Sequence, residues 1–247
     1  MDHHTLAAVS IAGISLDVLG GLYLAYDLLG GKHGPLRLLT RMVTYSIVFG
    51  AGFGLGMGMF FGIVCGAAVG ITIAIELHRT ATSNDYYSLP WETLFSAIRG
   101  TGFAAGLYWM VGLRFAVIFG IFATAGQVVA YARGIRPSID YVAARHARPT
   151  SRQLWAALVR TLAYIVTALL CSTFVRHIDH PWLFALRVGL VTGIVTVIGI
   201  AMNPYIEYYA DNLPERRLGA FGIALVLVGF ALQSVQYCLT LFDVPIT

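Results

Sequence analysis

The sequence predicts an all-α protein, a polytopic integral membrane bundle of six to eight transmembrane helices. Of its 247 residues, 58% are hydrophobic and only 11% are charged, whereas soluble domains carry about 25% charged residues. Apolar stretches of the length that crosses roughly 30 Å of hydrocarbon recur along the chain. We therefore expect a single transmembrane domain over residues 1–247, surrounded by a lipid bilayer.

The first apolar segment covers residues 6–29 and carries a carboxylate near its middle, Asp17. Ionisable side chains inside a bilayer are costly, face protein or water, and often mark ion or substrate pathways. Asp17 is therefore a candidate ion- or solute-binding residue, and Glu76 in a later segment is another. The alternative for Asp17 is a protonated carboxyl group that hydrogen-bonds a neighbouring helix. No Lys or Arg precedes this segment, so we expect no removable signal peptide.

The stretch from Met42 to Leu77 carries a glycine at every fourth residue, and residues four apart share one face of a helix. Such stripes let transmembrane helices approach closely, which predicts glycine-zipper packing. The packing glycines would be Gly50, Gly54, Gly58, Gly62, Gly66 and Gly70, joined by Gly102 and Gly106 in a later segment. The alternative is a hinge or a pore-lining helix.

This glycine stretch is too long for one crossing, because a single helix over it would extend roughly 54 Å at about 1.5 Å per residue. Either one long helix projects from the membrane, or two helices form a hairpin that turns near Met57 and Gly58; we prefer the hairpin. Residues 100–132 pose the same question with Arg114 at their centre. A single helix would bury Arg114 beside a partner such as Asp17, whereas a hairpin would leave it solvated at a turn.

The two long segments also share a residue pattern. A shift of fifty residues places Ser46, Phe53 and five glycines on identical residues. We predict an internal repeat over residues 42–79 and 92–133, with a weaker third copy of the glycine spacing in residues 181–203. Internal repeats are common in transporter folds, where binding sites form at repeat interfaces. With hairpins in both long segments, the bundle has eight spans.

Basic residues predict the orientation, because short cytoplasmic loops are enriched in Lys and Arg. The cytoplasmic loops would be residues 30–41, 132–153 and 203–217, which places both termini outside the cell membrane. Three further spans are expected at residues 154–175, 183–202 and 218–242. The net charge of +4 is explained by these loops, so we expect no nucleic-acid partner.

Other features indicate little chemistry. His177, Asp179 and His180 could bind a metal, but this loop spacing is a weak signal for a zinc site, and interfacial polar residues are the simpler interpretation. The sequence contains no catalytic or phosphate-binding motif. We therefore expect no enzymatic activity and no cofactor.

Two functions fit these features. The first is a small-solute or ion transporter or channel that uses Asp17 in mid-membrane; it predicts that Asp17→Asn abolishes flux. The second is a non-catalytic assembly or scaffold subunit, whose glycine grooves pack the helices of a second copy or of a membrane partner protein. It predicts that Gly62→Leu destroys the complex. We favour the first.

Overall fold

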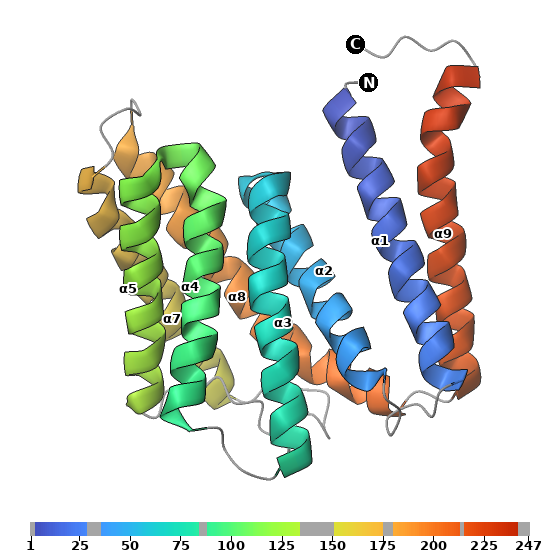
Figure 1. The fold of residues 1–247 in the computed structure, drawn as a ribbon, viewed down its shortest axis with the longest axis horizontal. Coiled ribbons are helices and arrows are strands. Elements are labelled where there is room, and N and C mark those ends of the chain that lie inside the picture. The colour runs from blue at the N-terminus through green and yellow to red at the C-terminus, as the bar shows by residue number, and fades with distance from the viewer. Residues whose placement is uncertain are drawn as a thin grey trace. The chain divides into compact units, whose positions relative to one another are not determined.

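The computed structural model describes residues 3–28, 36–83, 88–133, 151–174, 180–212 and 215–241. The elements in these ranges are eight α-helices and one short 3₁₀ helix (Figure 1). Six of these helices are long and apolar enough to cross a membrane. The fold is therefore all-helical and compatible with a helical membrane bundle, the class that the sequence predicts.

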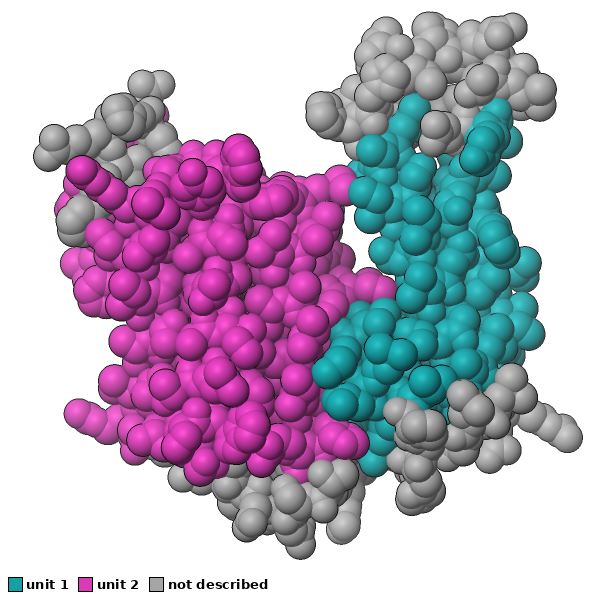
Figure 2. All heavy atoms as spheres, in the orientation of Figure 1, with its two compact units in different colours: residues 1–43, 210–247 teal, residues 44–209 magenta. Residues whose placement is uncertain are grey.

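The chain divides into two compact units (Figure 2). The terminal unit comprises residues 1–43 and 210–247, and the central unit comprises residues 44–209. The two division points, after Val43 and after Tyr209, both fall inside helices, so each of these two helices has one end in the terminal unit and the rest in the central unit. Most of the glycine-rich sequence belongs to the central unit.

In the terminal unit, two helices pack through glycines that are seven residues apart. The helices are α1 (His3–Leu28) and α9 (Glu215–Leu241). A Cβ added to Gly13 would lie 2.7 Å from the carbonyl oxygen of Gly229, and one added to Gly20 would lie 2.6 Å from that of Gly222. Glycine at these positions therefore allows the two backbones to touch, as in other small-residue contacts between membrane helices.

Six helices form a closed ring in the central unit. They are α2 (Arg37–Met57), α3 (Met59–Ser83), α4 (Leu89–Val111), α5 (Leu113–Ala132), α7 (Ser151–Cys171), which continues into the 3₁₀ helix η2 (Ser172–Phe174), and α8 (Pro181–Asn212). In Figure 1, α2 to α5 stand side by side with α7 and α8 behind them. The contacts that close the ring are Gly50–Gly62, Gly102–Ala68, Gly100–Gly120, Gln127–Tyr164, Thr161–Gly193 and Val195–Gly52.

Single glycines turn the chain between α2 and α3 and between α4 and α5. Gly58 has a φ of 101° and Gly112 a φ of 83°, a backbone region that glycine enters at no steric cost. The first break falls where the sequence placed it, after Met57. Gly58 is nevertheless not a packing glycine as expected, because nothing lies within 4 Å of a Cβ added there. The positive φ at this position, and not close packing, therefore explains why residue 58 is a glycine.

Each of the three helix pairs α2–α3, α4–α5 and α7–α8 packs at two positions that are one helical turn apart. In every pair the second helix supplies glycine or threonine at these positions. The facing pairs are Gly66–Gly50, Gly70–Ser46, Gly120–Ala104, Thr124–Gly100, Gly189–Ile165 and Gly193–Thr161. Of the other expected packing glycines, Gly54 and Gly62 face each other across the α2–α3 pair. Gly102 and Gly106 face Ala68 and Phe61 on α3 instead.

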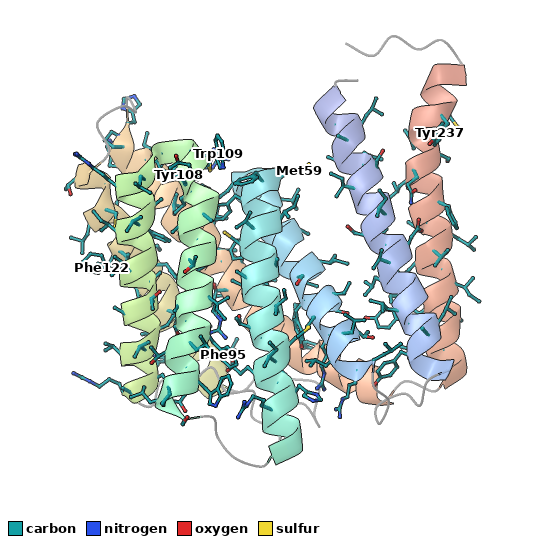
Figure 3. The ribbon with its side chains drawn as sticks, viewed as in Figure 1. Met59, Phe95, Tyr108, Trp109, Phe122 and Tyr237 are labelled. Carbon is teal, nitrogen blue, oxygen red and sulfur yellow. The ribbon has the colours of Figure 1, made fainter. Side chains whose placement is uncertain are left out.

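Aromatic rings fill the half of the ring of helices that lies toward the two glycine turns. The ring of Phe103 on α4 lies 5.7 Å from that of Phe53, 6.4 Å from that of Phe61 and 6.1 Å from that of Phe119, between centroids. All four side chains are buried. Figure 3 shows Met59 and Trp109 at the end of the unit with the turns. The interior is therefore apolar in this half.

One expected loop is largely helical. Helix α8 runs to Asn212, so much of the loop expected at residues 203–217 is absent. A proline inside a helix removes one hydrogen bond and displaces the carbonyl four residues before it. In membrane helices, neighbouring groups can satisfy the freed backbone groups, so the helix can continue. Helix α4 begins at Leu89, so residues 91–99 form its first part.

Candidate functional site

One face of α4 carries polar residues into the interior of the central unit. Glu92, Ser96 and Arg99 follow each other at intervals of four and three residues, which places them on the same side of a helix. They are 0%, 0% and 5% exposed. The opposite side carries exposed apolar residues such as Leu94 and Ile98. This arrangement reverses that of a soluble amphipathic helix and is compatible with an outer face in lipid.

Arg99 joins three helices through its guanidinium group. Its Nη2 donates to Oε2 of Glu76 on α3 at 2.7 Å, and its Nε donates to Oγ1 of Thr72 on the same helix at 2.9 Å. Its Nη1 donates to Oε1 of Gln127 on α5 at 3.2 Å. The carboxylate of Glu92 lies 4.0 Å from Nη1 and accepts a hydrogen bond from Ser96. All three nitrogen atoms of Arg99 are therefore satisfied by protein oxygens.

The network continues into α7. Nε2 of Gln127 donates to the hydroxyl oxygen of Tyr164 at 3.0 Å. The ring of Tyr164 packs on that of Phe103, 5.8 Å between centroids, which connects the polar network to the aromatic half. Arg160 lies one helical turn before Tyr164 and shares its face. The charges of Arg160 and Arg99 lie close enough to act on the Tyr164 hydroxyl group.

Arg160 differs from Arg99 in its hydrogen bonding. It is 7% exposed, yet its Nε and Nη2 have no hydrogen-bond partner among the residues that the structure describes. An unpaired buried cation costs several kcal/mol in effective desolvation. The site thus combines a fully paired arginine with one whose donors are open.

The arrangement supports two kinds of role. A buried network whose members are all satisfied fixes helices in one geometry. Charged groups that face the interior of a membrane bundle also bind ions and polar solutes. The Arg99 part of the network fits the first role, and the open donors of Arg160 fit the second.

The three sequence candidates for ion or solute binding lie in different places. Glu76 belongs to the network. Arg114 is exposed two residues after Gly112, so the uninterrupted helix that would have buried it in mid-membrane does not form. Asp17 lies in the terminal unit, where Gln233 of α9 donates to its Oδ2. This hydrogen bond joins two helices, as the alternative interpretation expects, whereas the protonation of Asp17 and ion binding there both stay predictions.

The candidate metal site at residues 177–180 lies only partly within the residues that the structure describes. His177 and Asp179 lie outside the described residues, and His180 is exposed just before α8. Within the ranges that the structure describes, no group of three His, Cys, Asp or Glu residues could hold a metal ion.

Most residues of the network were not predicted from the sequence. They are Glu92, Arg99, Gln127, Arg160 and Tyr164. A signal did exist in α4. Glu92, Ser96 and Arg99 recur at helical spacing, and Thr93 is the only polar residue between them. Arg160 also lies inside an expected span, residues 154–175. An ionisable residue in a span is by itself a reason to consider a binding site.

No family model matches the chain, and searches of the curated proteins and of the solved structures return no match either. The inference of function therefore depends on the geometry of the site.

Proposed function

We propose that the protein moves a small solute or ion across a membrane through the six-helix ring of the central unit. The observation that carries the proposal is the polar network inside this ring, where Glu76, Glu92, Arg99 and Arg160 are all at least nine-tenths buried. Ionisable groups in such positions are expensive and typically line substrate or ion pathways. Asp17 becomes a packing residue in this proposal, since its carboxylate accepts a hydrogen bond from α9.

The two halves of the ring support a pathway that is closed on one side. The aromatic half around Phe103 excludes polar solutes, whereas the network occupies the half toward the ends of α3 and α5. The loops at these ends include residues 132–153, which their arginines predict to be cytoplasmic. A solute would therefore reach the network from the cytoplasm, and the aromatic rings would have to separate for it to leave on the other side.

Flux through proteoliposomes tests the proposal. The probes are protons, K⁺, Cl⁻, inorganic phosphate and glutamate, each compared with protein-free liposomes. We expect at least one protein-dependent flux, which Glu76→Gln lowers about tenfold or more, because hydrogen bonds to charged groups contribute about 1.5–3 kcal/mol. Asp17→Asn is the control, since an amide oxygen still accepts from Gln233, and it should leave flux near the wild-type value.

Two outcomes would contradict the proposal. If Asp17→Asn abolishes flux and Glu76→Gln does not, the pathway involves the terminal unit. If the folded protein gives no flux with any probe, the assembly role that the sequence also predicts gains support. Gel filtration of both variants shows whether each remains folded.

We also propose eight membrane crossings. The helices that fall outside the six long apolar ones are α4 and α7, and both carry the buried charges of the network. Their polar residues face the interior of the ring, so their outer faces remain suited to lipid. In the ring, both helices also lie between neighbours that are among the six long apolar helices, which supports their crossing with them.

Side-specific cysteine labelling checks this topology. In a variant without the three native cysteines, single cysteines replace Met59, Arg114 and Ser88. We expect Met59→Cys and Arg114→Cys, which flank the glycine turns, to react with a water-soluble maleimide from one side of the membrane and Ser88→Cys from the other. Labelling of Met59→Cys and Ser88→Cys from the same side would mean that α3 does not cross.

A further inference from the structure

The open donors of Arg160 lie on the edge of the guanidinium group that recognises oxyanions. The N–H bonds of Nε and Nη2 point in parallel, so this edge can form two hydrogen bonds to the oxygens of one carboxylate or phosphate group. In Arg160 these are the two atoms without a partner among the described residues. The unpaired donors thus match a bidentate anion.

Two other arginines of the central unit show how the same edge of the guanidinium group is used elsewhere in the fold. The same edge of Arg99 is filled, by Thr72 through Nε and by Glu76 through Nη2. The same edge of Arg187 on α8 is also filled, because both nitrogens donate to the carbonyl oxygen of Gly56, at 3.1 and 2.7 Å. The fold therefore provides protein oxygens for this edge in two arginines, whereas Nε and Nη2 of the buried Arg160 have no partner among the described residues.

The position of Arg160 fits a ligand that enters from one end of the ring. The buried side chains of α7 form a single stripe at intervals of three and four residues, composed of Ala157, Arg160, Tyr164, Ala168 and Cys171. Arg160 stands in the first turn of the apolar part of α7, residues 157–171. Arg160 is therefore closer along the chain to the predicted cytoplasmic loop, residues 132–153, than to the end of the ring with the two glycine turns.

We propose that Arg160 binds a small oxyanion, a carboxylate or phosphate group, through its Nε and Nη2 atoms, with Tyr164 and Gln127 beside the ligand. This inference deepens the proposed function by naming its substrate class and rests on it in that respect. Both nitrogen atoms are closed to solvent in this structure, so the anion enters when neighbouring side chains move apart. Its negative charge then compensates the charge of the buried guanidinium group.

Binding of labelled inorganic phosphate and acetate to the protein in phosphatidylcholine nanodiscs tests the site. We expect saturable binding of one anion per chain. Arg160→Lys keeps the charge but loses the fork of donors, so the affinity should fall about tenfold or more. Arg114→Met removes an exposed arginine at the Gly112 turn and should leave the affinity unchanged. Phosphate should also raise the melting temperature of the wild-type protein but not of Arg160→Met.

A second set of nanodiscs distinguishes a free anion from a lipid headgroup. If the ligand is a headgroup, nanodiscs that contain phosphatidylglycerol retain this lipid on the wild-type protein in native mass spectrometry, and Arg160→Lys loses it. Either form of Arg160-dependent binding supports the oxyanion site. Binding that is absent in both kinds of nanodisc, or unchanged in Arg160→Lys, would overturn it. Anion binding without any flux would instead contradict transport and leave the site standing.

Discussion

Replacing Arg99 with methionine is expected to lower the free energy of unfolding by about 3–5 kcal/mol, the usual loss when one partner of a buried ion pair is removed. Methionine has a similar length but cannot neutralise Glu76, whose carboxylate lies 2.7 Å from the guanidinium group. It also leaves Glu92 without its nearby positive charge. Equilibrium unfolding in mixed micelles, followed by tryptophan fluorescence, measures the difference.

Two matched variants make this result specific. Arg99→Lys preserves the charge but cannot bond Thr72, Glu76 and Gln127 together, so its loss should fall between those of the wild type and Arg99→Met. Arg114→Met removes an exposed arginine, and such surface changes stay within about 0.5 kcal/mol. A loss below about 1 kcal/mol for Arg99→Met would show that the network does not hold the ring together.

Gly70→Ala should destabilise the α2–α3 pair by about 3 kcal/mol, the upper part of the range for overpacked interiors. An added Cβ would lie 2.5 Å from Cα of Ser46 and 2.6 Å from the carbonyl carbon of Tyr45. Both are backbone atoms, which cannot rotate away as a side chain can, so the two helices would have to separate. The same unfolding measurement quantifies the effect.

Gly54→Ala is the matched control on the facing helix. The nearest atom to its added Cβ is Cα of Gly62 at 3.8 Å, an ordinary van der Waals distance. Alanine also favours the helix by roughly 1 kcal/mol over glycine in water. We therefore expect no loss of stability in this variant. Equal losses for Gly54→Ala and Gly70→Ala would contradict the close approach at Gly70.

The turn at Gly58 could be found from the sequence because both of its causes are local. The apolar stretch is longer than a bilayer, and glycines are dense where the chain has to reverse. The sequence does not distinguish glycines that pack against another helix from glycines that form a turn. Gly58 and Gly62 are equivalent in a four-residue stripe, but Gly62 packs on Gly50 whereas Gly58 takes a positive φ.

The predicted repeat illustrates the same difficulty. Residue identities favoured a shift of fifty, which places the packing residue Gly62 on the turn residue Gly112. The two turns are instead 54 residues apart, at Gly58 and Gly112. The packing residues Gly66 and Gly120 are separated by the same interval. The internal repeat stays a prediction, and 54 is the shift that matches residues by role.

The network was only partly predictable, because its partners lie on different helices. Glu76 was found as an ionisable residue in an apolar segment, and its neighbour Arg99 was readable from the polar spacing along α4. The link from Gln127 to Tyr164 depends on α5 packing against α7. Neither α5 nor α7 contains a sequence pattern that indicates the other as its neighbour. The position of Arg160 beside the hydrogen bond between Gln127 and Tyr164 therefore could not be predicted from local sequence.

The pairing of α1 with α9 has a consequence for how the protein is made. The two helices are separated by 186 residues, so at roughly 5–20 residues per second a ribosome needs about 10–40 s to pass from one to the other. During this time Asp17 lacks Gln233, its hydrogen-bond partner. The ring of six helices can assemble before α9 is synthesised, so the terminal unit is the last to form. A chain that stalls late in translation would therefore retain a complete ring and an unpaired carboxylate in α1, which is a signal that quality-control machinery in the membrane could detect.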